Sequence, residues 1–190
     1  MRQRFFGLFF LLGLLITGLP ATVRAANTFT DPQGRFTFTI PDGLTVDDRY
    51  TGQQASGIEI GVVLTPTTPA DPQTLGNNVN VTIQSLGGMT ASVDDAGPTI
   101  LNNLQQAIPS ATPDGVGFQS LTVGGMPAQR YGYVATINGL AVHGSQVAVI
   151  AGNNIYFMTF TATDDTFADF IAQTNGLLTS FMFLNNPATT

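Results

Sequence analysis

Residues 126–163 read MPAQRYGYVATI-NG-LAVHGSQVAVIA-GNN-IYFMTFTAT, and this stretch decides the fold. The Asn-Gly pair at residues 138–139 is a strong hairpin signal, because a tight two-residue turn needs positive φ at both positions. Gly-Asn-Asn at residues 152–154 closes a second hairpin. The segments between the turns are rich in β-branched and aromatic residues, which favour strands. The sequence therefore predicts three consecutive antiparallel strands, at residues 126–137, 140–151 and 155–163.

Five more strands are expected before this stretch. In residues 35–40 the apolar side chains alternate, and the Asp-Pro-Gln-Gly that precedes them is a good turn sequence. This alternation predicts a strand with one buried face. Similar patterns predict further strands at residues 27–30, 57–65, 78–85 and 118–123.

Two helices are expected beside the sheet. Residues 94–108 place Ile100, Leu104 and Ile108 on one apolar stripe, with Pro98 in the first turn. A final helix is expected at residues 164–180, with Thr163 as its N-cap. Its predicted buried face consists of Phe167, Phe170, Ile171, Leu178 and Phe181. A short edge strand at residues 180–183 and a flexible tail at residues 185–190 complete the chain.

Several segments, taken in order, carry a family resemblance. Residues 36–43, FTFTIPDG, are similar to an opening pattern F-x-F-x-I-P-x-G. Residues 124–131, residues 156–162 and the closing SFMF at residues 180–183 follow in the matching order. In this the chain resembles the secreted bacterial branch of the PsbP-like superfamily, which also includes photosystem extrinsic proteins and a small-GTPase-binding nuclear factor.

The resemblance implies a fold and a type of role. The implied fold is α+β, an α/β/α sandwich with a central antiparallel sheet flanked by helices, here as a single domain at residues 26–184. Members of the superfamily are mostly non-enzymatic, so the resemblance brings no catalytic residues to this chain. The basic residues that some photosynthetic members use for docking are missing from this sequence.

The N-terminus has the pattern of a secretory signal peptide. Arg2 and Arg4 precede an apolar run at residues 5–19, and Val23 and Ala25 stand at the −3 and −1 positions of a small-residue cleavage site. An uncleaved signal anchor is the alternative, because the run is long for a signal peptide, although short for a membrane span. We expect a signal peptide at residues 1–25 and a secreted or periplasmic protein without a stable membrane anchor after cleavage.

Charge and composition exclude several classes of function. The chain has 12 acidic and 6 basic residues, and three of the basic residues lie in the leader. Cleavage would leave three Arg against 12 acids, a net charge of −9. Because phosphate contacts need Lys and Arg, nucleic acid is not an expected partner. The chain has no Cys, so its core must stabilise it without disulfides.

Few residues can support catalysis. Beyond the leader the chain has one His, one Glu and no Lys, so acid–base and Schiff-base chemistry have almost nothing to draw on. His143 and Ser145 share a strand face, which makes a Ser–His dyad one hypothesis. The simpler interpretation is a His on a half-exposed strand. We predict no catalytic residues, no cofactor and no enzyme activity.

Asp47 and Asp48 are the candidate metal ligands. They lie in a predicted loop, and a hard cation such as calcium takes roughly six to eight oxygen ligands. No acid pair in the chain has the spacing of a calcium-binding loop. The pairs at residues 94–95 and 164–165 stand at predicted helix starts, where negative charge is favourable in any case.

Two basic–aromatic pairs are the candidate partner contacts: Arg49 with Tyr50, and Arg130 with Tyr131. Tyr131 alternates with Gln129 and Tyr133, so these side chains can equally pack under a helix. The loops at residues 42–57, 65–75 and 85–98 are long and rich in Gly and Pro, as contact loops often are.

Three hypotheses for function follow. The first is a non-catalytic secreted or periplasmic domain that binds a protein or cell-envelope partner. The second is a carrier of a small ligand or divalent cation in a pocket between sheet and helix. The third is a hydrolase that uses His143 and Ser145.

Overall fold

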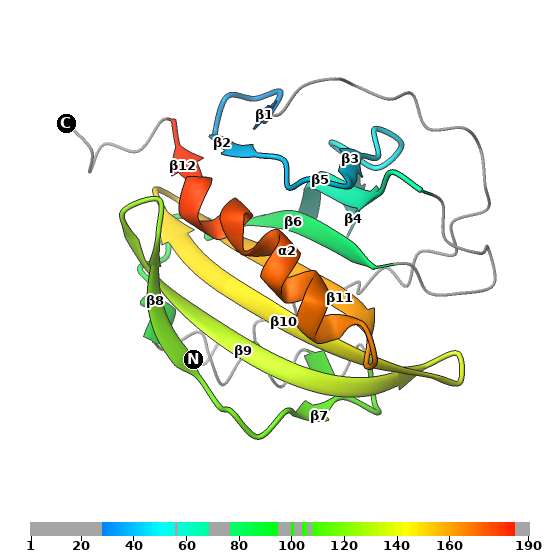
Figure 1. Cartoon of the computed structure of the whole chain (residues 1–190). Coiled ribbons are helices and arrows are strands. Elements are labelled where there is room, and N and C mark those ends of the chain that lie inside the picture. The colour runs from blue at the N-terminus through cyan, green and yellow to red at the C-terminus, as the bar shows by residue number, and fades with distance from the viewer. Residues whose placement is uncertain are drawn as a thin grey trace.

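The computed structural model describes residues 28–55, 57–68, 77–94, 100, 104–105 and 108–184. The predicted signal peptide and the predicted tail lie outside these residues. Within them the protein is mostly antiparallel sheet (Figure 1). No helix in the described part of the chain is both long and apolar enough to cross a membrane.

The described strands form two sheets. The large sheet has the order β3-β5-β6-β11-β10-β9-β7, with β4 on β5 and β8 on β9. Its strands are β3 (Leu44–Val46), β4 (Gln54–Ala55), β5 (Ile58–Pro66), β6 (Asn78–Ser85), β7 (Thr112–Pro113), β8 (Gln119–Val123), β9 (Met126–Ile137), β10 (Leu140–Ala151) and β11 (Asn154–Thr163). The small sheet has the order β1-β2-β12 and consists of β1 (Thr28–Thr30), β2 (Phe36–Thr39) and β12 (Met182–Phe183).

The hairpin prediction for the second half of the chain is confirmed. Ile137 pairs with Leu140, and the turn residues Asn138 and Gly139 have φ values of 53° and 81°. At the next turn Ala151 pairs with Asn154, so this turn has two residues instead of the expected three. β9, β10 and β11 thus form the meander that the turn chemistry predicts.

The expectation of one sheet is wrong for the chain ends. β1, β2 and β12 pair only with one another, and β2 buries residues on both of its faces. Phe36 and Phe38 stack on Phe181, with ring centroids 5.1 and 5.8 Å apart. Gly61 of β5 lies against the Phe36 ring, so aromatic packing joins the small sheet to the large one.

One helix has bounds within the described residues, α2 (Phe167–Ser180), and it lies along one face of the large sheet over β10 and β11 (Figure 1). Its predicted start was wrong, because residues 164–166 form a turn and Thr166, not Thr163, is the N-cap residue. The Thr163 hydroxyl bonds to the Thr166 hydroxyl at 2.8 Å instead. Phe170, Thr174 and Leu177 are the fully buried helix residues.

The other face of the large sheet receives the apolar stripe predicted before β7. Residues 93–94, 100 and 104–105 are helical, and the rest of that predicted helix lies outside the described residues. Ile100 packs with Phe157, whereas Leu104 and Ile108 pack with Tyr131 and Tyr133. The large sheet therefore has an α2 face and a second face that these residues cover in part.

Candidate functional site

A cleft lies between α2 and the large sheet. It is narrow, with a cavity volume of about 10 Å³, which is room for about one water molecule. Phe160 contributes an apolar wall from β11, and Arg130 and Ser145 enter from β9 and β10. The helix contributes four residues with the spacing of one helix face, which are Ile171, Thr174, Asn175 and Leu178.

The hairpin register brings the two polar sheet residues together. Gly132 pairs with Ser145 across β9 and β10, and Arg130 stands two residues from Gly132 on the same face. Arg130 Nε donates a hydrogen bond to Ser145 Oγ at 2.8 Å. Ser145 is 1% exposed, so its hydroxyl fixes the guanidinium at the base of the cleft.

Arg130 differs from the two other arginines of the described chain. Arg35 bonds two carboxylates: its Nε lies 2.7 Å from Asp31 Oδ2 and its Nη2 lies 2.6 Å from Glu59 Oε1. The Asp31 hydrogen bonds, with help from Glu59, raise the pKa of Arg35 above its usual value. The Arg130 side chain, by contrast, has no carboxylate within 4.0 Å among the described residues, and its hydrogen bond there goes to Ser145.

The candidate metal ligands Asp47 and Asp48 do not converge. Asp47 is 4% exposed and accepts a hydrogen bond from Arg49 Nη2 at 2.6 Å, which holds the pKa of that carboxyl below its usual value. Asp48 is exposed instead. No group of three or more His, Asp or Glu residues in the described chain has the geometry of a metal site. A cation site at this loop is thus not assembled by the described residues.

Of the two candidate contact pairs, only Arg49 with Tyr50 brings its two side chains together. The Arg49 guanidinium lies 5.4 Å from the centre of the Tyr50 ring, so this pair forms a cation–π contact near the surface. Arg130 and Tyr131 do not form one patch, because adjacent residues of β9 point to opposite faces. Tyr131 is 3% exposed, packs with Leu104 and Ile108, and is not available as a surface contact.

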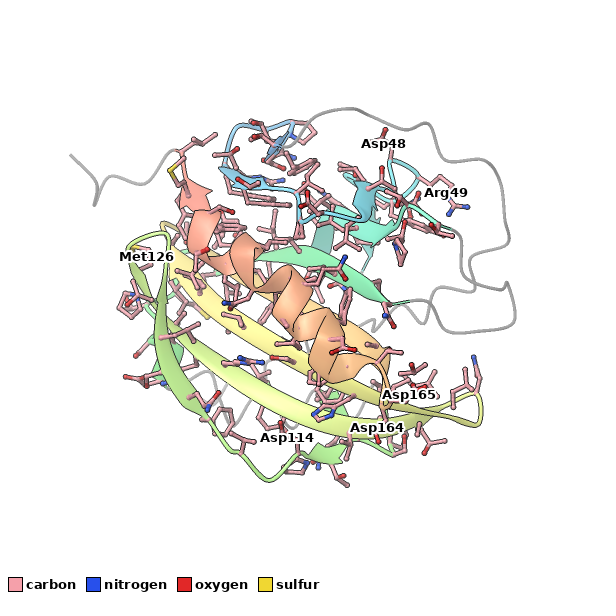
Figure 2. The ribbon with its side chains drawn as sticks, in the orientation of Figure 1. Asp48, Arg49, Asp114, Met126, Asp164 and Asp165 are labelled. Carbon is pink, nitrogen blue, oxygen red and sulfur yellow. The ribbon has the colours of Figure 1, made fainter. Side chains whose placement is uncertain are left out.

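His143 and Ser145 do not form a dyad. His143 stacks on Phe167 with ring centroids 3.9 Å apart, and its two ring nitrogens lie 3.6 Å from Asp114 and 3.5 Å from Asp164. Ser145 is bonded to Arg130 instead. Figure 2 shows Asp114 and Asp164 near the start of α2, far from Asp48 and Arg49. The described chain therefore brings a His between two acids, not beside a nucleophile.

Known structures share this architecture, although no protein-family model and no curated protein matches the chain. The solution structure of cyanobacterial PsbP (CyanoP) from Synechocystis sp. PCC 6803 matches with a TM-score of 0.61 at 14% identity, over 88% of this chain and 98% of that one. LpqN, involved in cell envelope biogenesis of Mycobacterium tuberculosis, matches with a TM-score of 0.58 at 14% identity, over 78% and 83%. The chain has a PsbP-like fold. The resemblance carried by residues 36–43 and the later segments is confirmed at this level.

A third match shows that the PsbP-like fold also occurs within longer chains. A protein from Bacteroides thetaiotaomicron matches with a TM-score of 0.53 at 11% identity, and the match covers 83% of this chain but 48% of that one. Identities this low show the fold alone.

Arg130 and Ser145 meet in one cleft, a contact that was not among the predictions from the sequence. The signal was present in the hairpin. A two-residue turn at residues 138–139 fixes the register of β9 against β10, and so places Arg130 diagonally across from Ser145. No local pattern in the sequence predicted which residues of α2 would line the cleft.

Proposed function

We propose that this protein is a non-catalytic, extracytoplasmic domain that binds a protein or another component of the cell envelope. The likeness to LpqN over most of both chains carries the proposal, because that protein is involved in cell envelope biogenesis. The N-terminal pattern of a signal peptide supports the location. The engagement of His143 and Ser145 with separate partners supports the absence of catalysis.

The proposal includes the full α/β/α arrangement. We infer that the helical residues 93–94, 100 and 104–105 cover the second face of the large sheet, as α2 covers the first. The burial of Ile100, Leu104 and Ile108 at four-residue intervals supports this inference. Together with residues 26–184 as a single domain, it gives a rigid framework from which loops project.

The proposed contact surface is the loop between β3 and β4, with Arg49 and Tyr50. It runs beside β5, between the pairing of Val46 with Leu64 and that of Gln54 with Glu59. The connections that follow β5 and β6 leave from opposite ends of the β5–β6 pair, because Leu64 pairs with Val79 and Ile58 with Gln84. The three predicted contact loops therefore do not form one surface.

A crosslinking pull-down from the envelope fraction of the native cells, read by mass spectrometry, tests the proposal. We expect one dominant partner whose capture saturates and falls severalfold in the Asp48→Ala/Tyr50→Ala variant. This variant keeps the Asp47–Arg49 ion pair intact. The matched control is Asp165→Ala, an exposed acid on a separate part of the molecule (Figure 2). Equal capture by all three proteins would exclude the loop, and capture of nothing would exclude the binding role.

The signal peptide has its own test. We expect the exported protein to begin at Ala26, as measured by intact mass and N-terminal sequencing. A chain that retains residues 1–25 in the membrane fraction would instead establish the signal anchor.

The second candidate function, that of a small-ligand or divalent-cation carrier, has less support. The cleft between sheet and helix has a cavity volume of only about 10 Å³, room for about one water molecule. Its charged residue is an arginine, which suits an anion and not a divalent cation.

A further inference from the structure

We propose that the outer edge of β8 pairs with β8 of a second copy of this chain and forms an antiparallel dimer. The inference goes beyond the proposed function and does not depend on the envelope partner. It rests on the hydrogen-bonding groups of this edge, on their symmetry and on the charge of the molecule.

The edge of β8 is open to another strand. Within the described chain β8 pairs with β9 alone, so it forms an edge of the large sheet (Figure 1). It has five residues, whereas the other edge strands, β1, β3, β4, β7 and β12, have two or three. Proteins commonly block an exposed edge with a proline, a charged residue or a β-bulge. Gln119–Val123 contains no proline and no charge, and its register against β9 has no shift.

The turn at residues 124–125 determines which backbone groups of β8 face outward. It has two residues, so the residues on either side of it form the hydrogen-bonded pair that closes the hairpin. Hydrogen-bonded and non-hydrogen-bonded pairs then alternate, which makes Thr122 with Pro127 and Ser120 with Gln129 non-hydrogen-bonded pairs. The proline fits this assignment, because it has no N–H to donate. The N–H and C=O groups of Ser120 and Thr122 therefore point away from β9.

These outward groups match those of a second β8 that runs antiparallel to the first. When Leu121 stands opposite the partner's Leu121, Ser120 of each copy stands opposite the partner's Thr122. Each such pair can exchange two hydrogen bonds, one in each direction. Four bonds across a two-fold axis then satisfy all the outward groups of both copies, none of which bonds to another group of the described chain.

The surroundings of β8 leave access for a second strand. The helix α2 lies over β10 and β11, so β9 separates it from β8 (Figure 1). Just before β8, Val116 and Phe118 are 62% and 44% exposed. In the two-fold arrangement Phe118 lies beside the partner's turn at residues 124–125, which consists of two glycines and has no side chain to obstruct the ring. Pairing therefore also covers apolar surface at both ends of the two strands.

The charge of the molecule favours contact at this edge. The chain has a net charge of −6, so two copies repel each other over most of their surfaces. Residues 115–129 contain no charged residue. Asp94 lies beside this stretch, where its carboxylate accepts a hydrogen bond from Gln129 Nε2 at 2.6 Å. A second copy that pairs with β8 meets an uncharged strand, and no like charges stand opposite each other in the pairing.

The length of the strand predicts a weak dimer. Stable interfaces bury roughly 1,200–2,000 Å² in total. Two strands of five residues, each about 17 Å long, bury less than this even with Phe118. We therefore expect pairing that depends on concentration, with a dissociation constant on the order of 100 µM.

Sedimentation of the exported protein from micromolar to millimolar concentration, together with amide hydrogen exchange followed by NMR, tests the proposal. We expect the mean mass to rise from that of one copy toward that of two. The amides of Ser120 and Thr122 should exchange severalfold more slowly in the concentrated sample. The Leu121 amide, which bonds to β9, should be equally protected in both samples.

Three results would overturn the self-pairing. The first is a chain that stays monomeric at millimolar concentration. The second is a dimer in which another segment, and not β8, gains protection. The third is protection of β8 only after addition of the envelope partner, which would assign the edge to that partner. Partner capture in the pull-down is a separate readout, so failure of the dimer leaves the proposed function standing.

Variants at Thr122 separate its outward N–H from its side chain. Thr122→Pro removes the N–H without loss of a bond to β9, and should weaken pairing at least tenfold. Thr122→Val keeps the N–H and should leave the dissociation constant within threefold. Equal dissociation constants for Thr122→Pro and Thr122→Val would contradict the interface.

A pair of charge variants tests the same edge independently of how well the proline variant folds. Thr122→Glu adds a negative charge to each strand of the dimer and should weaken pairing at least tenfold. Asn175→Glu adds the same charge at an exposed position of α2 and should change the dissociation constant less than threefold. An equal effect of the two changes would mean that only net charge, and not the edge of β8, controls association.

Discussion

Gly144 and Tyr133 show how a single missing side chain shapes the large sheet. They pair across β10 and β9, and a Cβ on Gly144 would overlap the Tyr133 ring. The ring is completely buried and lies against Leu104 and Ile108, so it has no room to move aside. Gly144 is thus required for the close approach of a ring, not for an unusual backbone conformation.

This contact predicts the effect of Gly144→Ala. The added methyl group should lower the free energy of unfolding by about 1–3 kcal/mol, as overpacking of a filled core does. Urea denaturation measures this value. In a Tyr133→Leu background, where the ring is gone, the same change should cost much less. Equal losses in the two backgrounds would show that the ring is not the cause.

Tyr133 also predicts a dependence on alkaline pH. Burial raises the pKa of Tyr133 to about 12, from 10.0 in the unfolded chain. Because the folded state keeps the phenol protonated, its contribution to stability is complete below pH 10 and is lost as the pH rises toward 12. The loss should amount to about 2–3 kcal/mol over that window.

Denaturation of Tyr133→Phe at several pH values checks this expectation. The variant should lose less stability than the wild type between pH 10 and 12, because it has no phenol to ionise. Parallel pH curves would mean that another group controls alkaline unfolding.

At the scale of elements, α2 packs tightly on its buried face and has a helix-destabilising glycine on its exposed face. Leu177 is completely buried and Phe170 nearly so. Gly176, the residue before Leu177, is exposed, and no atom beyond its neighbours and its own helix backbone lies within 4 Å of the position that its Cβ would occupy. The helix therefore has an unfavourable residue that packing does not require.

Gly176→Ala should stabilise the protein by about 0.5–1 kcal/mol, because alanine loses less backbone entropy in a helix. Thermal unfolding measures the gain. Gly124→Ala is a suitable contrast, since Gly124 has a φ of 56° and its Cβ would lie 2.8 Å from the Phe183 ring. That change should lower the melting temperature. A loss of stability in Gly176→Ala would show that the helix needs the glycine.

At the scale of the whole molecule, Arg35 joins the two sheets electrostatically. It follows the turn between β1 and β2 and bonds Asp31 in that turn and Glu59 on β5. The Asp31 side chain is 1% exposed and that of Arg35 15%. A charge so deeply buried is tolerated only while its partner is present.

Arg35→Met should therefore cost about 3–5 kcal/mol, the usual penalty for an unpaired buried charge. The triple variant Asp31→Asn/Arg35→Gln/Glu59→Gln removes all three charges and should recover part of the loss. Chemical denaturation compares the two. A loss below about 1 kcal/mol in Arg35→Met would mean that Asp31 finds water or another donor.

The elements that could be predicted are those whose conformation depends on neighbouring residues in the sequence. The meander of β9, β10 and β11 depends on turns whose residues dictate their own conformation, as at Asn138, and it was predicted nearly to the residue. β3, β4 and β7 have only two or three residues and were missed, because their partners, not their own patterns, make them strands. The separate small sheet depends on contacts between distant phenylalanines, which no local pattern shows.

In the candidate site, too, some contacts could be predicted from the sequence and others could not. The meeting of Arg130 with Ser145 follows from the hairpin register and was within reach of the sequence. The ion pair that occupies Asp47 and the burial of Tyr131 were not, since each depends on what packs above the strand. The His143–Ser145 hypothesis assumed that residues on one face interact, whereas each side chain found a nearer partner.

The pairing of β12 with β2 determines when the small sheet can form during synthesis. β2 forms early in the chain, but its neighbour on one side, β12, is among the last described residues. During synthesis, the edge of β2 that pairs with β12 stays open until residues 182–183 have left the ribosome. Folding of the small sheet is therefore a finishing step, and a chain stalled before residue 182 would keep an unsatisfied strand edge and exposed phenylalanines, the features by which quality-control proteases and chaperones recognise incomplete proteins.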